Sequence, residues 1–331
     1  MQHFLTTQKA LQRLLTSVYD KTYGQAYIFE GMKGVGKFTA AMLFAEAIHC
    51  TSQKKPCGVC PDCKKHMANT HPDLMIIEGE SARKVDDIRD MTDELYIRPA
   101  VSEKKICIVK NADNMNENAQ NALLKSFEEP PKYGVIILLS QNSQNLLPTI
   151  RSRGMKIAFE PFPEEDIFRY VTTAFDKSPE QARFISKYSG GVMGRAIDIC
   201  ENEQFFEARQ KMFDAVSNLT GDRTSIFEVA DLFGIRNSKT AFVGCDLYFD
   251  LFLSFMRDVL ALKTHSEVVN ADMLSSLESF SSKVTLASVI DIIENTANIK
   301  KQLNASMKYD LWIMDMLINC WEDIHGKSNR S

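Results

Sequence analysis

Apolar residues between positions 24 and 160 gather into five short, nearly continuous runs. Each run has the length and the β-branched or aromatic content expected of a strand that is buried on both faces. The runs are AYIF (26–29), LMII (74–77), KICIVK (105–110), VIILLS (135–140) and MKIAF (155–159). Helical patterns separate them, and parallel strands are joined by right-handed connections. The pattern therefore predicts a doubly wound α/β fold, with a parallel sheet between two layers of helices.

The pattern changes at EPFP (160–163), where two prolines interrupt the chain. Beyond this point we find no strand pattern, and helical periodicity continues to the end. The stretch Ser178-Pro179-Glu180-Gln181 is a capping box with proline at the first helical position. We therefore expect three parts: an α/β core over 1–160, a small helical domain over 161–203 and an all-helical domain over 204–331.

Near the end of the chain, four apolar residues recur at helical spacing. They are Met307, Leu311, Met314 and Ile318. We expect this stripe to lie in the core of the all-helical domain. The alternative is a surface that packs against partner chains.

Composition and charge narrow the class of protein. With 331 residues, 44% hydrophobic content and 25% charged residues, the chain fits two or three globular domains. A net charge of −4 disfavours tight DNA binding by this chain alone, because such proteins are usually basic. The N-terminal sequence lacks the pattern of a signal peptide, and LFLSFM (251–256) is too short to span a bilayer. The expected compartment is the cytoplasm, with no membrane partner.

The stretch GMKGVGKFTA (31–40) follows the first predicted strand and opens a predicted helix. Gly31, Gly36 and Lys37 fit the phosphate-binding pattern G-x-x-x-x-G-K, with Gly34 as a further flexible position. Backbone N–H groups of such a loop surround phosphate oxygens. Phe38, however, stands where a Mg²⁺-binding hydroxyl is needed, and Thr39 points about 100° further round the helix. The loop predicts phosphate binding at most, and whether ATP binds is left open.

The acidic partner of the loop is also altered. Phosphoryl transfer needs an aspartate for Mg²⁺ and usually a carboxylate that polarises the attacking water. At the end of the third strand these positions hold Lys110 and Asn111, and Asp113 comes only two residues later. Two independent losses predict that this chain does not hydrolyse ATP. The alternative is an active ATPase that uses Thr39 and Asp113 as displaced substitutes.

Four of the eight cysteines form a compact cluster with C-x6-C-x2-C-x2-C spacing: Cys50, Cys57, Cys60 and Cys63. Two-residue gaps allow thiolates to converge on one ion, and four sulfur ligands suit Zn²⁺. We therefore expect a structural zinc knuckle over 50–63. The alternative is four unliganded thiols, and His66 and His71 are spare candidate ligands.

The run KICIVKNADNMNENAQNALLKSFEEPP (105–131) resembles one family closely, the bacterial DNA polymerase III clamp loader, an AAA+ assembly. The cysteine knuckle and the following HPDL (71–74) strengthen this resemblance, which covers roughly residues 20–160. It implies an AAA+ core over 1–160, a helical lid over 161–203 and a helical collar for oligomerisation over 204–331.

The family contains ATP-hydrolysing motor subunits and a non-motor subunit. Motors have GKT or GKS in the loop and Asp-Glu on the acidic strand, where this chain has Phe38 and Lys110-Asn111. The sensor-1 position near Gln141 lacks the motor's threonine, and the sensor-2 arginine is replaced by Gly194, with Arg195 displaced by one. The resemblance therefore implies a non-motor stator subunit, with a gamma/tau-type motor as the alternative.

The family's serine-arginine-cysteine motif matches Ser152, Arg153 and Gly154. The resemblance implies that Arg153 is an arginine finger, offered in trans to ATP on a neighbouring motor. It also implies the partners: gamma/tau motor subunits, a delta subunit, the sliding clamp and primer-template DNA, in a hetero-pentamer. A zinc-dependent nucleic-acid-binding module built on an AAA+ frame is a third hypothesis, which the acidic balance disfavours.

Overall fold

The computed structural model describes residues 8–77, 85–234, 245–303 and 309–325. The chain divides into two compact units, Met1–Asp198 and Ile199–Ser331, each of which is described by itself. The predicted division of the first unit at residue 160 stays a prediction.

The first unit contains one five-stranded parallel sheet with the strand order β2-β3-β4-β1-β5. The strands are β1 (Ala26–Glu30), β2 (Leu74–Ile77), β3 (Lys105–Val109), β4 (Gly134–Ser140) and β5 (Met155–Ala158). All five predicted strands are present. β3 and β4 are buried along their whole length and β1 along its centre, whereas the edge strand β2 is half-buried and the edge strand β5 is largely exposed, contrary to the expected burial on both faces. The α/β parallel-sheet prediction is confirmed.

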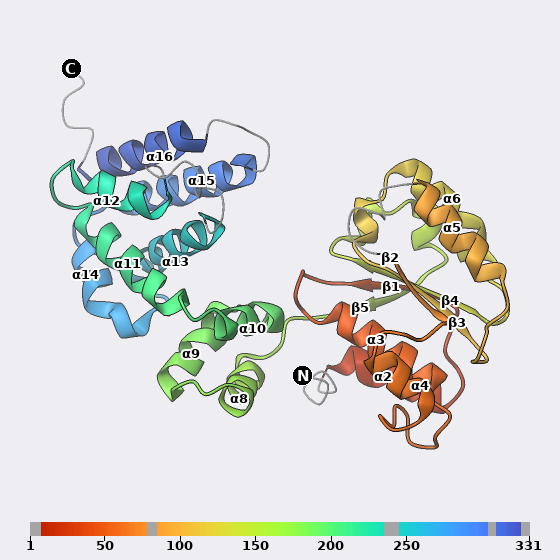
Figure 1. The fold of residues 1–331 in the computed structure, drawn as a ribbon. Helices are drawn as coiled ribbons and strands as arrows, with labels where there is room; N and C mark the ends of the chain where they lie inside the picture. The colour runs from red at the N-terminus through yellow and green to blue at the C-terminus, as the bar shows by residue number, and fades with distance from the viewer. Residues whose placement is uncertain (1–7, 78–84, 235–244, 304–308, 326–331) are drawn as a thin grey trace. The chain divides into compact units, whose positions relative to one another are not determined.

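Helices cover both faces of this sheet (Figure 1). The helices before β5 are α2 (Lys9–Tyr19), α3 (Lys37–His49), α4 (Pro61–Met67), α5 (Val85–Tyr96), α6 (Glu117–Glu128) and α7 (Pro148–Arg151). Ile28 of β1 packs with α5 and α6 in one buried cluster. The alternate residues Tyr27 and Phe29 contact Phe44 of α3 edge-on or tilted. This alternation of side chains along one strand builds two separate cores.

Three further helices complete the unit: α8 (Glu164–Ala174), α9 (Pro179–Tyr188) and α10 (Met193–Glu201). The predicted capping box is present at the start of α9, where Ser178 and Gln181 bond each other's backbone N–H groups. Phe162 donates its backbone N–H to Gly191 at 2.8 Å, which ties the loop before α8 to the turn before α10.

The second unit is helical throughout its described residues. Its α-helices are α11 (Phe205–Asn218), α12 (Ser225–Leu232), α13 (Cys245–Lys263), α14 (Leu274–Ser281), α15 (Leu286–Leu303) and α16 (Tyr309–Ile324). Phenylalanines dominate its interior, with Phe255 packed edge-on against Phe213 and Phe280.

The predicted apolar stripe of the last helix is wrong in register. Leu311 is 66% exposed, Met314 and Ile318 are half-buried, and Met307 lies outside the described residues. The buried face of α16 carries instead Ile313, Met316, Leu317, Cys320 and Ile324. Both sets have helical spacing, and the helix is apolar over so wide an arc that spacing alone does not select the buried edge.

Candidate functional site

The glycine-rich loop joins β1 to α3 and is closed by a lysine from the first turn of that helix. Gly31, Gly34 and Gly36 have φ angles of 154°, 87° and 92°, a region that favours glycine. Lys37 donates hydrogen bonds from Nζ to the carbonyl oxygens of Gly31 and, at 2.8 Å, of Met32. Burial lowers the pKa of Lys37, which is 9% exposed, and the charge of Asp113 partly opposes this. The loop forms the expected strand-loop-helix turn, and phosphate binding by it stays a prediction.

A cavity of about 370 Å³ lies at this loop. Its lining includes Phe38 and Thr39 from α3, Lys110 from the end of β3, Gln141 from the end of β4 and Gly194 from α10. The glycine-rich loop and the positions at which motor residues are replaced therefore line the same cavity.

The two altered positions contact each other. The Lys110 ammonium nitrogen lies 3.7 Å from the centroid of the Phe38 ring, which is the geometry of a cation–π interaction. An aromatic ring and an ammonium group thus stand side by side where a metal-binding hydroxyl and carboxylate were expected. Since Mg²⁺ binds oxygen ligands, neither side chain can coordinate it.

The two substitutes that an active ATPase would need are placed differently. Thr39 lines the cavity, whereas Asp113 is not part of its lining. The Asp113 carboxylate accepts hydrogen bonds from the backbone N–H groups of Gln141 and Asn142, at 3.2 and 3.4 Å. Both bonds end on the same oxygen, Oδ2, so one oxygen of this carboxylate fixes the turn after β4.

The helix α10 closes directly onto the loop through two glycines. Gly194 donates its backbone N–H to the Gly34 carbonyl at 2.9 Å. A Cβ on Gly194 would lie 3.0 Å from the Gly34 Cα, so a side chain at this position would push the two segments apart. The displaced Arg195 lies over the Tyr188 ring, 5.4 Å from its centroid, and does not line the cavity. No arginine from α10 therefore reaches the site.

Arg153 lies on the surface just after α7. Its Nε lies 2.9 Å from Glu128 Oε1, and its Nη1 donates to the Thr149 carbonyl at 3.1 Å. It is not part of the lining of the cavity in its own chain. Ser152 is exposed and donates its Oγ–H to the same Thr149 carbonyl at 3.0 Å. The serine thus shapes the turn that carries the arginine.

The glycine that replaces cysteine in the Ser-Arg-Cys motif has a packing reason. A Cβ on Gly154 would lie 2.7 Å from two carbon atoms of Ile28 and 2.9 Å from the Phe127 ring. Such contacts are closer than packed carbon atoms tolerate, so a side chain at this position would have to displace Ile28 and the Phe127 ring.

The four cysteines of the predicted knuckle converge. Their sulfur atoms all lie within 4.8 Å of one another, with Cys57 and Cys63 3.9 Å apart and Cys50 and Cys60 4.0 Å apart. Backbone N–H groups of Val59 and Cys60 lower the pKa of Cys57 to about 6, whereas burial raises the pKa of Cys63. The cluster offers four sulfur ligands for one ion, and zinc as its occupant stays a prediction.

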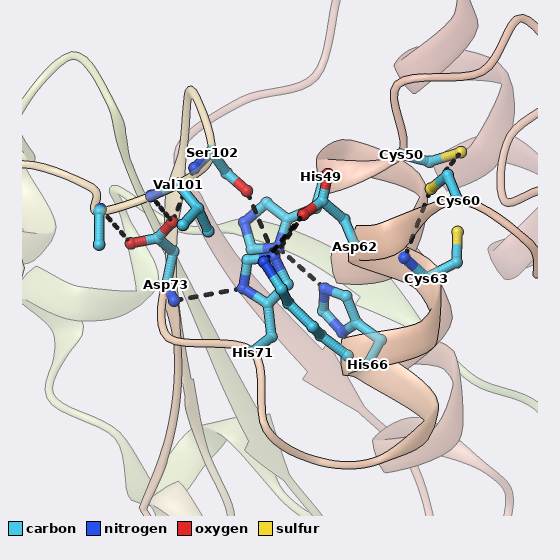
Figure 2. A network of polar contacts seen from close by, with 12 residues as sticks. His49, Cys50, Cys60, Asp62, Cys63, His66, His71, Asp73, Val101 and Ser102 are labelled. Carbon is cyan, nitrogen blue, oxygen red and sulfur yellow. Dashed lines mark hydrogen bonds and ion pairs between the residues drawn. The ribbon is translucent and has the colours of Figure 1, made fainter.

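A second cluster adjoins the knuckle, and its central member was not predicted. Figure 2 shows His49 beside His66 and His71, all buried. His49 Nε2 lies 3.0 Å from the Lys104 carbonyl and therefore donates to it, which leaves His49 Nδ1 to accept from His66 Nε2 at 2.8 Å. His49 stands at the end of an apolar helix and has no spacing motif, so only the fold reveals its role.

His71 extends the same network toward the sheet. Its Nδ1 accepts the backbone N–H of Asp73 at 3.2 Å, so its proton sits on Nε2, which lies 3.5 Å from an Asp62 oxygen. Burial lowers the pKa of His49 to about 3 and that of His66 to about 4, which keeps both rings neutral. The nitrogens are close enough for a metal ion, but their hydrogen bonds describe a neutral network that anchors the knuckle to the sheet.

Comparisons with known proteins agree with this picture. Two family models match: "DNA polymerase III, delta subunit" over residues 6–163 and "DNA polymerase III, delta subunit, C terminal" over residues 203–322. The delta prime subunit of Bacillus subtilis DNA polymerase III is 30% identical over 308 residues, covering 90% of this chain and 91% of the relative. That of Pseudomonas aeruginosa is 28% identical over 315 residues, covering 92% and 93%.

A relative with a different subunit name, tau, matches over a shorter span. The tau subunit of Escherichia coli DNA polymerase III is 28% identical over 203 residues, which are 59% of this chain and 32% of tau. Among the described helices, none combines the length and the apolar character that a bilayer crossing requires. The two family models and the end-to-end similarity to delta prime subunits show that the chain belongs to the DNA polymerase III delta prime family.

Proposed function

We propose that the chain is the non-motor subunit of a DNA polymerase III clamp loader, in which neighbouring motors use ATP to load the sliding clamp onto primed DNA. The observation that carries this proposal is the contact between Phe38 and Lys110, 3.7 Å from ring centroid to ammonium. It fills the expected magnesium position with two groups that cannot bind the ion. The nearly complete overlap with delta prime relatives, against the partial overlap with tau, supports the same assignment.

Loss of hydrolysis follows from electrostatics. A magnesium ion brought to this cavity would face the ammonium groups of Lys110 and the buried Lys37, and the carboxylate in the lining, Asp198, comes from α10 rather than from the end of β3. Like charges at such short range repel, and the attacking water would have no carboxylate to polarise it, since Asn111 stands at that position. A phosphate group without metal remains compatible with the loop's geometry.

Arg153 supplies the function that the chain keeps. Its guanidinium is permanently charged, is not part of the lining of its own cavity and lies on an exposed turn. Placed at the γ-phosphate of a neighbouring motor, it would stabilise the charge that develops on the transferred phosphoryl group. The chain would thus complete the active site of another subunit, with the collar over 204–331 holding the hetero-pentamer together.

The remaining partners and the metal belong to the same proposal. The chain would assemble with gamma/tau motors and a delta subunit, and it would meet the sliding clamp and primer-template DNA as part of the complex. Zn²⁺ in the four-cysteine cluster would be structural, because four protein ligands leave no open coordination position.

The purified chain is expected to show no ATP turnover. With Mg-ATP and without partners, phosphate release should equal that of a protein-free control, and a purified motor subunit in the same assay should turn over. Replacement of Lys37 by methionine should change nothing, because no productive metal site exists for it to serve. Turnover that depends on Lys37 would instead identify an active motor that uses Thr39 and Asp113.

A further inference from the structure

The Arg153 guanidinium is held at two of its three nitrogens by its own chain. Glu128, the last residue of α6, lies 2.9 Å from the guanidinium Nε, and the Thr149 carbonyl accepts from Nη1 at 3.1 Å. Both charged side chains are partly exposed, at 42% for Arg153 and 35% for Glu128. The pair therefore sits at the surface, where a neighbouring subunit can reach the arginine.

The backbone under this pair is fixed by packing. The missing Cβ of Gly154 lets the Phe127 ring and the Ile28 side chain close against the turn. Phe127 is buried, and it directly precedes Glu128. Neighbouring residues of α6 and of the turn after α7 thus touch in two places: Phe127 with Gly154 in the core, and Glu128 with Arg153 at the surface. The carboxylate consequently has a defined position relative to the guanidinium.

The contacts leave three N–H groups of the guanidinium available. A guanidinium has five N–H donors, and the two contacts above engage Nε and one N–H of Nη1. No other partner of Arg153 is found in the part of the chain that the structure describes, so its Nη2 group can address a ligand. A free arginine side chain loses substantial rotamer entropy when it docks, and a carboxylate that already contacts Nε removes part of that loss in advance.

We propose that Glu128 is a positioning residue that orients Arg153 toward the nucleotide of a neighbouring motor. This inference rests on the proposed function of Arg153. If Glu128 instead held the guanidinium away from the neighbouring nucleotide, removal of Glu128 would raise the rate of ATP hydrolysis. Positioning is favoured because Glu128 and Thr149 engage two of the five N–H groups and leave three, including both on Nη2, in the same plane.

The test uses the reconstituted clamp loader and its DNA- and clamp-stimulated ATPase, with assembly checked by native mass spectrometry. Glu128→Ala should lower kcat by about three- to fivefold, the range open to an exposed ion pair, and leave KM for ATP unchanged. Glu128→Gln should restore much of the rate, because its amide oxygen still accepts from Nε. Glu129→Ala, the exposed neighbour on the same turn, should behave like the unmodified complex.

A double-mutant cycle separates the two claims. In the Arg153→Ala background, Glu128→Ala should have no further effect, because there is no guanidinium left to orient. A normal rate for Glu128→Ala beside a low rate for Arg153→Ala would overturn the positioning role and leave the finger intact. A raised rate for Glu128→Ala would show that Glu128 holds the arginine away from the nucleotide. An equal loss on adding Glu128→Ala with Arg153 present and with Arg153→Ala would show a merely structural role. A normal rate for Arg153→Ala would overturn the finger itself.

Discussion

Replacing Arg153 by alanine in the reconstituted complex should reduce ATP hydrolysis at the adjoining motor site by about 10³-fold or more, as in other systems that use an arginine finger. The physical reason is the loss of a fixed cation at the phosphoryl group, where charge spreads over three oxygens in the transition state. Single-turnover phosphate release, stimulated by clamp and primed DNA, measures this step directly. Steady-state ATP turnover of the whole complex should fall by at least the fraction that the adjoining motor site contributes.

The matched variants identify which property of the side chain matters. Arg153→Lys keeps the charge but lacks the planar fork, so it should recover only a small part of the rate. Arg151→Ala removes a neighbouring arginine that bonds Gln144 within its own chain, and it should leave stimulated hydrolysis near normal. Full activity of the Arg153→Ala complex would show that Arg153 is not an arginine finger.

Loss of the metal is expected to have the second-largest effect. The purified chain should contain about one zinc ion, since the four sulfur atoms lie within 4.8 Å of one another. Cys63→Ser should abolish metal binding and cost ~3–5 kcal/mol of folding free energy, because metal affinity is folding free energy for such a site. At about 2–4 °C per kcal/mol, the unfolding temperature should fall by roughly 10 °C.

Elemental analysis and thermal unfolding check this prediction together. Cys107→Ala is the control: this buried thiol lies in the β3 core, away from the cluster, so the variant should lose stability through packing but keep its zinc. If the chain is purified without metal and its unfolding temperature does not respond to a chelator, the zinc prediction is wrong and the four cysteines are unliganded thiols.

The sheet and its loop were predictable from the sequence because their signals are local. Strands that are buried on both faces require continuous apolar runs, and 105–110 and 135–140 have them. The cysteine spacing likewise places four thiols within one short segment. The losses at Phe38 and Lys110 were visible as single substitutions, but their contact joins positions 72 residues apart in α3 and after β3.

What sequence reasoning missed depends on such distant contacts. The Glu128–Arg153 pair links the end of α6 to the turn after α7, and no spacing rule connects these residues. His49 joins the network of His66 and His71 only because α3, α4 and the segment before β2 meet in space. In α16 the sequence offered two apolar edges of one helix, and the packing partners selected the edge with Ile313 over that with Leu311.

Under the proposed function, this chain completes a neighbour's active site while its own site is silent. Stimulated ATP turnover of two reconstituted complexes tests it most directly, one with Lys37→Met and one with Arg153→Ala in this chain only. We expect an unchanged rate for Lys37→Met, whose aliphatic stem keeps the buried packing, and a large loss for Arg153→Ala. A loss with Lys37→Met and normal turnover with Arg153→Ala would contradict it.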